Sequence, residues 1–166
     1  MVTITSIVGS IDKSPSLAKE YRMRSKLNQV ESITINRLES QRIRMRKRSN
    51  KGTDIIITLN EDFKLRHNDV LLLDDTKMVL VNREPENVAI LDIKRNDIGL
   101  AIRIGHALGN LHRPIKVEGN SIIFPIQSDG EIEMLGKLLH LATDSFSAKK
   151  AMMVFEPEEG MDVHGH

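Results

Sequence analysis

The hydrophobic pattern of this chain changes at residues 83–87, and this change is the strongest constraint on its fold. Before it, apolar residues recur in short runs with the two-residue period of β-strands. After it, strand patterns alternate with helix patterns. The segment between them, Arg83-Glu84-Pro85-Glu86-Asn87, is polar and contains proline, which is typical of a linker. We therefore expect two small domains rather than one.

The first half predicts a small all-β domain over residues 1–82. Its expected strands are 2–8, 30–38, 42–48, 53–59, 70–73 and 78–81. Residues 74–77, Asp-Asp-Thr-Lys, suit a hairpin loop between the last two strands. Ser14-Pro15-Ser16 indicates a loop, and no segment of this half shows a convincing helix pattern.

The second half predicts a ferredoxin-like domain over residues 88–155. Strand 88–93 is followed by a helix that starts after an N-cap at Asp97 and runs to about Leu108. Strands 115–117 and 122–126 come next, joined by a turn at 118–120, and then helix 130–141 and strand 149–155. The order β-α-β-β-α-β is that of the ferredoxin-like motif, so the expected fold class of the chain is α+β.

Residues 156–166 differ from both halves. They are acidic, poor in apolar residues, and end in His164-Gly165-His166. Segments of this composition at a chain end are commonly mobile. We expect a flexible acidic tail that carries two histidines.

Composition excludes several kinds of site. The chain has 166 residues and no cysteine, which rules out disulfides, thiolate zinc sites and cysteine nucleophiles. Aromatic residues make up only 3%, so an aliphatic core is expected. The net charge of +1 argues against wholesale binding of polyanions. No signal peptide and no membrane-spanning apolar run is visible, so the expected location is cytoplasmic, with no membrane partner.

The segment Gly105–Pro114, Gly-His-Ala-Leu-Gly-Asn-Leu-His-Arg-Pro, places two histidines around the expected end of a helix. Gly109 and Asn110 suit a left-handed helix cap, and Pro114 prevents the helix from resuming. His112 should then lie on a short, stiff exit from the helix. Imidazole is the commonest metal-binding side chain and suits nickel, copper and zinc.

This segment resembles the signature of the urease accessory protein UreE family, which are nickel metallochaperones. The length, the basic β-rich first half and the histidine-bearing tail fit the same family. The resemblance implies a nickel carrier with no catalytic residues, Ni(II) as cargo, and Zn(II) or Cu(II) as ions that bind in vitro. It also implies a first domain similar to a peptide-binding module of chaperones. Its implied partners are a urease accessory GTPase and the urease apoprotein, with no nucleic acid.

The metal ligands expected in this chain are His112, His164 and His166. The resemblance implies a homodimer, or a tetramer in which dimers pair around the metal, with His112 of each protomer at the interface. A residue near a two-fold axis can face its own copy, and two imidazoles leave an incomplete shell from which an ion can be released. His164 and His166, on the tail, would assist capture.

The other histidines fit ordinary roles better. His106 lies six residues before His112, which is not the spacing that places two ligands on one helix face, so a packed or hydrogen-bonded role is expected. His67 falls in a polar loop and is expected to be exposed. His140 falls late in the second helix, where a half-buried role is expected.

Arginines recur at alternate positions in the strand expected at 42–48: Arg42, Arg44, Arg46 and Arg48. Such a row fits a solvated strand edge, a docking surface for an acidic protein, or a nucleic-acid interface. The nearest aromatic residues are Tyr21 and Phe63, which weakens the case for RNA because RNA modules usually stack bases on aromatic rings.

Two alternatives to the carrier remain. A metal-dependent hydrolase needs a general base beside an open metal position, but no acidic residue occurs between Asp97 and Glu118. A nucleic-acid-binding module would use the arginine row at 42–48 and would bind with strong salt dependence.

Overall fold

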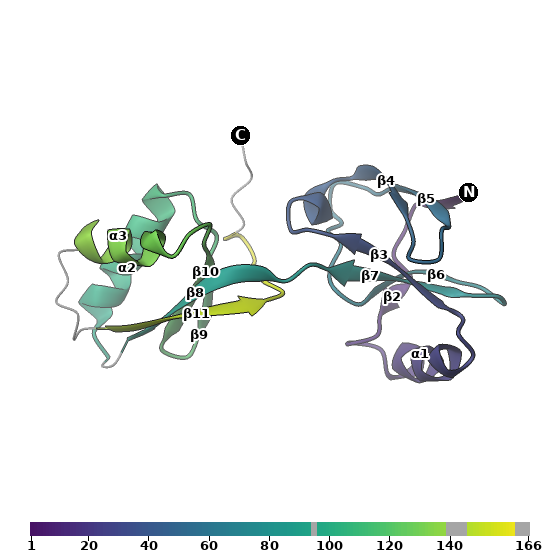
Figure 1. Ribbon diagram of the computed structural model, residues 1–166, viewed down its shortest axis with the longest axis horizontal. Coiled ribbons are helices and arrows are strands. Elements are labelled where there is room, and N and C mark those ends of the chain that lie inside the picture. The colour runs from purple at the N-terminus through teal and green to yellow at the C-terminus, as the bar shows by residue number, and fades with distance from the viewer. Residues whose placement is uncertain (94–95, 139–145, 162–166) are drawn as a thin grey trace. The chain divides into compact units, whose positions relative to one another are not determined.

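The computed structural model describes residues 1–93, 96–138 and 146–161. The chain divides into two compact units, Met1–Glu84 and Pro85–His166 (Figure 1). The expected fold class, α+β, is confirmed. None of the described helices is long and apolar enough to span a membrane.

The N-terminal unit contains two sheets. The three-stranded sheet has the order β1 (Val2–Ile4), β5 (Asp54–Thr58), β4 (Arg44–Arg48). The four-stranded sheet has the order β2 (Gly9–Ser10), β6 (Asp69–Leu73), β7 (Met78–Arg83), β3 (Val30–Ile35). A short 3-10 helix, η1 (Glu39–Gln41), lies between β3 and β4. The expected hairpin at residues 74–77 joins β6 and β7, which pair antiparallel.

The core of this unit is aliphatic, as the composition indicated. Alternate residues of β3 and β5 are buried, because successive side chains of a strand point to opposite faces. The main cluster contains Ile4, Ile33, Ile35, Ile55, Ile57, Leu59, Leu65, Leu71, Val79 and Val81. These residues come from both sheets, so the two sheets bury their apolar faces in one core.

The prediction that the first half contains no helix was wrong. Helix α1 (Pro15–Lys26) follows Ser14, whose hydroxyl accepts a hydrogen bond from the backbone N–H of Leu17 at 3.3 Å. Ser14 is thus an N-cap and Pro15 occupies the first turn, where proline is favoured. The helix is mostly polar, and only a narrow stripe that includes Leu17 and Tyr21 packs on the four-stranded sheet. Its hydrophobic periodicity was therefore weak.

The segment interpreted as a linker is mostly strand. Strand β7 continues to Arg83, which is only 1% exposed, and β8 (Glu86–Ile93) begins three residues later. The backbone N–H of Glu84 donates to the carbonyl of Ile35 at 2.9 Å. Only Glu84 and Pro85 of this segment lie outside strands. The linker was predicted because the side chains of the segment are polar, although its backbone is extended.

The C-terminal unit has the expected order β-α-β-β-α-β. Its elements are β8, α2 (Ile98–Asn110), β9 (Lys116–Glu118), β10 (Ser121–Pro125), α3 (Gly130–Leu138) and β11 (Phe146–Met153). The sheet order is β11-β8-β10-β9, and every neighbouring pair is antiparallel. The first and third strands of the unit are therefore central, as in a ferredoxin-like sheet.

Both helices cover one face of this sheet (Figure 1). Leu100, Ile104 and Leu108 of α2 are buried against alternate residues of β8 and β10. The expected N-cap is confirmed, since the carboxylate of Asp97 accepts the N–H of Leu100 at 2.9 Å. On the opposite face, Phe155 is fully buried with Val88 of β8 and Ile123 of β10. The last three residues of the second expected helix, including His140, lie outside the described residues.

The buried carboxylate of Glu31 connects β3 to the residue that follows β4 and to the residue that precedes β7. Glu31 of β3 is 8% exposed, accepts a hydrogen bond from the Ser49 hydroxyl at 2.7 Å and lies 3.4 Å from the ammonium of Lys77. Burial raises the pKa of Glu31, but the hydrogen bonds from Ser49, Thr53 and Lys77 outweigh this effect and lower it below its ordinary value of 4.5. The ionised carboxylate therefore stabilises the folded unit.

We predict that Glu31→Gln lowers the free energy of unfolding by about 1–2 kcal/mol at pH 7. A lowered pKa means that the stabilisation is present above the ordinary value of 4.5 and is lost as the pH falls through the folded-state value. The wild-type protein should therefore lose more stability than the variant between pH 6 and pH 3. Urea titrations across this range measure both curves, and parallel curves would contradict the role assigned to Glu31.

Candidate metal centre

Helix α2 ends in a reverse turn that fixes the backbone at His112. The N–H of His112 donates to the carbonyl of Gly109, and the N–H of Arg113 donates to the carbonyl of Leu108, both at 3.0 Å. This pair of bonds is the Schellman motif, in which the residue after the C-cap adopts the left-handed conformation. Leu111 is the C-cap, and His112 has φ +53°.

The prediction of a left-handed cap was right in kind but wrong in position. Gly109 and Asn110 are helical and belong to the last turn of α2, whereas His112 itself is the left-handed residue. A non-glycine residue with positive φ is uncommon, although histidine is enriched there. The strained backbone and the candidate ligand are thus the same residue, and the side chain of His112 is exposed.

An ion pair holds the segment that follows His112. Arg113 donates to Glu131 of α3 with a nitrogen–oxygen distance of 2.9 Å, and both side chains are largely buried. The second oxygen of Glu131 accepts the backbone N–H of Gln127 at 3.1 Å. Pro114, next in the chain, is buried. The exposed imidazole is therefore carried by a segment that is fixed on both sides of it.

A second carboxylate reaches the same segment from the C-terminal end of the chain. The N–H of Glu158 donates to the carbonyl of Ile115, and its carboxylate accepts the N–H of Val117, both at 3.0 Å. After β11, the chain thus passes the helix-free face of the sheet at Phe155 and reaches the edge strand β9 at the other side. Neither the contact of Glu131 with Arg113 nor that of Glu158 with Val117 was predicted, because each joins residues far apart in the chain.

The remaining histidines separate into described and undescribed ones. His106 is exposed rather than packed, and its Nε2 lies 3.1 Å from the side-chain amide of Asn110. The expectation that His67 is exposed was wrong, since it is half-buried and its Nδ1 accepts the N–H of Arg83 at 3.1 Å. His164 and His166 lie outside the described residues.

The described ranges 1–93, 96–138 and 146–161 contain no group of three His, Cys, Asp or Glu side chains that could hold a metal ion. His112 therefore belongs to no three-ligand site in the described part of one protomer. An ion bound there would take its other ligands from a second protomer, from residues 162–166, or from solvent.

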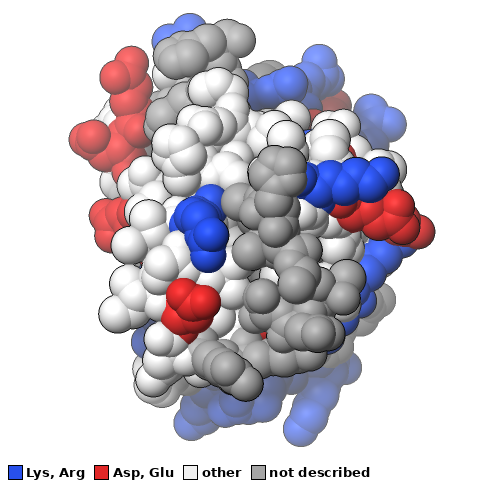
Figure 2. All heavy atoms as spheres, turned by 90° about the vertical axis from the view of Figure 1, so that its left-hand side faces the viewer, with Lys and Arg blue, Asp and Glu red and all other residues white. Residues whose placement is uncertain are grey.

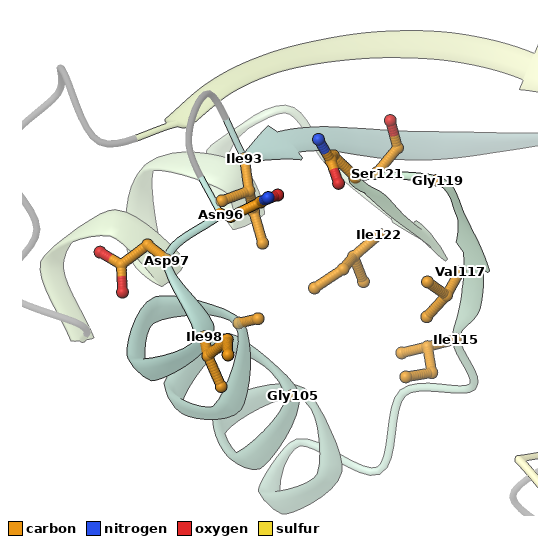
Figure 3. Close-up of a pocket in the computed structure, with 12 residues that line it drawn as sticks. Ile93, Asn96, Asp97, Ile98, Gly105, Ile115, Val117, Gly119, Ser121 and Ile122 are labelled. Carbon is orange, nitrogen blue, oxygen red and sulfur yellow. The ribbon is translucent and has the colours of Figure 1, made fainter.

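An apolar groove of about 410 Å³ runs beside this segment, between α2 and the β9–β10 hairpin. Ile115, Val117 and Ile122 point into it from the hairpin side, and Ile98 and Gly105 line it from the helix (Figure 3). Polar groups lie at its upper rim, among them Asn96 and Ser121. Gly105 and Ile115, which line the groove, flank the segment 106–114 that contains the His112 turn.

One stripe of the solvent-facing side of α2 is apolar, beside the exposed polar residues Arg103, His106 and Asn110. Ile98 is 74% exposed and Ile102 is 66% exposed, and with Gly105 and Gly109 they recur at helical spacing on one face. Figure 2 views the C-terminal unit from the left of Figure 1, and uncharged side chains cover most of the described surface there. Large exposed apolar patches mark interaction surfaces, so this face is a candidate interface.

The arginine row of the N-terminal unit is strand β4, which starts at Arg44. Arg44, Arg46 and Arg48 are exposed, while Met45 and Lys47 between them are half-buried. The alternation expected for residues 44–48 is thus confirmed, and Arg42 precedes the strand.

Comparison with known proteins gives a consistent result. The family model described as UreE urease accessory protein, N-terminal domain, matches residues 4–83. The chain is 28% identical to the urease accessory protein UreE 1 of Pseudomonas syringae pv. tomato over 144 residues, which cover 87% of this chain and 96% of that protein. It is 30% identical to UreE 1 of Pseudomonas syringae pv. syringae, covering 74% and 82%. The match to UreE of Yersinia pestis, at 27% identity, covers 100% and 80%.

The left-handed turn predicts an unusual order of stability among variants at position 112. Glycine adopts positive φ without steric cost, whereas alanine does not. We expect His112→Gly to have a free energy of unfolding about 1 kcal/mol higher than that of His112→Ala. At an ordinary helical position the order would be reversed. Chemical denaturation of the two variants decides the matter, and equal stabilities would contradict the turn.

Proposed function

The chain belongs to the urease accessory protein UreE family, whose members are accessory proteins and not enzymes, and we propose that it carries Ni(II) for assembly of the urease metallocentre. The observation that carries this proposal is the presentation of His112. Its exposed imidazole extends from a backbone turn. The turn is fixed by the hydrogen bond to the carbonyl of Leu108, by the Arg113–Glu131 ion pair and by the buried Pro114. Such a ligand is placed in advance, so less conformational entropy is lost when an ion binds.

The ion would be shared between two protomers. The exposed apolar stripe of α2, which includes Ile98 and Ile102, lies on the helix whose C-terminal turn contains His112. Pairing of this face with its own copy about a two-fold axis that runs along the helices would bury these isoleucines and bring the two helix ends into one interface. Two His112 imidazoles would then face each other, either in a homodimer or in a tetramer of paired dimers.

Two imidazoles make an incomplete shell, which suits a carrier. A closed set of four protein ligands holds an ion as a structural part, whereas an open position permits ligand exchange into a partner. Imidazole also binds Zn(II) and Cu(II), and the general affinity order of these ions does not favour nickel. The proposal therefore assigns the choice of nickel to the partners and to the supply of the ion.

The anchor at Glu158 supports the proposed role of His164 and His166. The N–H of Glu158 donates a hydrogen bond to the carbonyl of Ile115, which lies three residues after His112. The Cα atoms of Ile115 and His112 are therefore at most about 11 Å apart. His164 follows Glu158 by six residues, a chain length that spans at most about 21 Å. Tail histidines tethered so close to His112 would act there at a high effective concentration.

The proposed partners are the urease accessory GTPase and the urease apoprotein, to which a carrier must deliver its ion. Membership of an accessory-protein family disfavours the metal-dependent hydrolase. The two acids that the fold brings to the His112 segment, Glu131 and Glu158, are both engaged in structural contacts. Neither of them is therefore available as a general base.

We predict that His112→Gly abolishes the nickel ion shared by two protomers while the protein stays folded. Glycine is the better test than alanine because it removes the imidazole without straining the turn. Calorimetric titration with Ni(II), followed by native mass measurement, should give one tightly bound ion per dimer in the wild type and none in the variant. In the wild type, affinity should fall as the pH is lowered, because imidazoles must lose their protons to bind.

A second variant tests the shared site with His112 intact. Ile102→Lys places a charge on the exposed face of α2 and should yield monomers that lack the tight site. Tight binding of one nickel ion per chain by this monomer, or by His112→Gly, would refute the two-protomer site.

The Glu158 anchor gives a matched pair of variants. Glu158→Ala removes the carboxylate that accepts the N–H of Val117, whereas Glu159→Ala removes an exposed neighbour of the same charge. We expect Glu158→Ala to weaken the tail-dependent part of nickel binding by about threefold or more, because the tether to His112 lengthens. That part is the difference in affinity between the full chain and a chain ending at Met161. Equal effects of the two substitutions would contradict the anchoring role.

A further inference from the structure

Strand β4 is an edge strand, and no other strand of the described chain pairs with its outer side. In the sheet order β1-β5-β4 it has one neighbour, β5, with which it pairs antiparallel. The carbonyl of Ile43 accepts from Leu59, and the N–H of Ser49 donates to Thr53. Because inward hydrogen bonding alternates along a strand, residues 43, 45, 47 and 49 face β5. The backbone groups of Arg44, Arg46 and Arg48 consequently face away from the sheet.

The same three residues carry the exposed side chains of the strand. The Arg46 and Arg48 side chains are 66% and 70% exposed, and Arg44 is also exposed. A free backbone edge and a row of positive charge therefore coincide over three alternate residues, about 6.7 Å apart. An edge strand of this kind accepts an added strand from another polypeptide.

The positive charge of the row is unevenly compensated. Asp54 of β5 lies 3.0 Å from Arg46 and 3.7 Å from Arg48. The hydrogen bond from Arg46 is the main cause of the lowered pKa of Asp54. Arg44 faces Thr58 of β5 instead, and no carboxylate of the described chain lies within ion-pair distance of it. The uncompensated charge is thus at the Arg44 end.

We propose that the β4 edge binds an extended protein segment with acidic residues at alternate positions, which adds to the three-stranded sheet as a fourth strand. Residues directly opposite each other on paired strands project to the same face. Acidic residues opposite Arg44, Arg46 and Arg48 would therefore meet the guanidinium groups, while the two backbones pair. This inference does not depend on the proposed nickel site.

The surroundings of the row favour a polypeptide over a nucleic acid. The β5 residues that pair with Arg44, Arg46 and Arg48 are Thr58, Ile56 and Asp54, and the β1 residue beside Ile56 is Thr3. The strand residues of this face thus offer no aromatic ring on which a base could stack, which single-stranded nucleic acids commonly require.

The test uses a synthetic peptide, Thr-Glu-Val-Glu-Val-Glu-Thr with blocked ends, titrated into the full-length protein at low salt. Arg44→Gln should weaken binding by about two- to fivefold, the range of one exposed ion pair. Asp54→Asn should strengthen binding, because it releases Arg46 and Arg48 for the peptide. Arg22→Gln, which removes an exposed charge on α1, should have no effect and serves as the charge-matched control.

Backbone pairing is separated from simple charge attraction by N-methylation of the peptide. Only every second N–H of a strand faces a given neighbour, so methylating one alternate set should abolish binding and methylating the other should leave it unchanged. Equal binding of both methylated peptides, or of a peptide with its three glutamates adjacent, would overturn the proposal. So would a single-stranded RNA oligomer that binds more tightly than the peptide with the same dependence on Arg44.

Discussion

The hydrogen bond from the N–H of Arg113 to the carbonyl of Leu108 determines much of what the C-terminal unit can do. It closes α2 and forces the intervening residue, His112, into the left-handed region. The direction of the imidazole is then set by the backbone rather than by a buried side-chain network. The ion pair between Arg113 and Glu131 secures the turn to α3. A single helix terminus thus connects the packing of both helices to the exposed ligand.

The fold was largely predictable because most elements carry clear periodicity. The alternation of apolar residues in β3, the β-branched apolar run of β5 and the N-cap at Asp97 were sufficient to identify these two strands and the start of α2. Helix α1 was missed because its few apolar contacts do not dominate a polar sequence, and Ser14-Pro15 was interpreted as a loop. The same two residues form a helix start when the following turn packs on a sheet. Local signals of this kind are decided by tertiary contacts.

The candidate site was predictable in part. His112 was identified from a local motif, but its backbone conformation was assigned to Gly109 and Asn110. Gly109, Asn110 and His112 can all adopt the left-handed conformation of a helix cap. Which of them does so depends on where the packing of α2 ends the helix. Glu131 and Glu158 approach the site from 18 and 41 residues beyond Arg113 and Val117. One sequence, without a fold, gives no means of pairing residues at such separations.

The edge strands β4 and β9 differ in whether their outer backbone hydrogen-bonding groups are occupied. At β9, the N–H of Glu158 donates to the carbonyl of Ile115, and its carboxylate accepts the N–H of Val117. These outward-facing backbone groups therefore already have hydrogen-bond partners. A second molecule has little opportunity to extend the sheet there. Because unpaired edge strands promote edge-to-edge aggregation, the contacts of Glu158 protect this edge of the sheet from fibril-like growth.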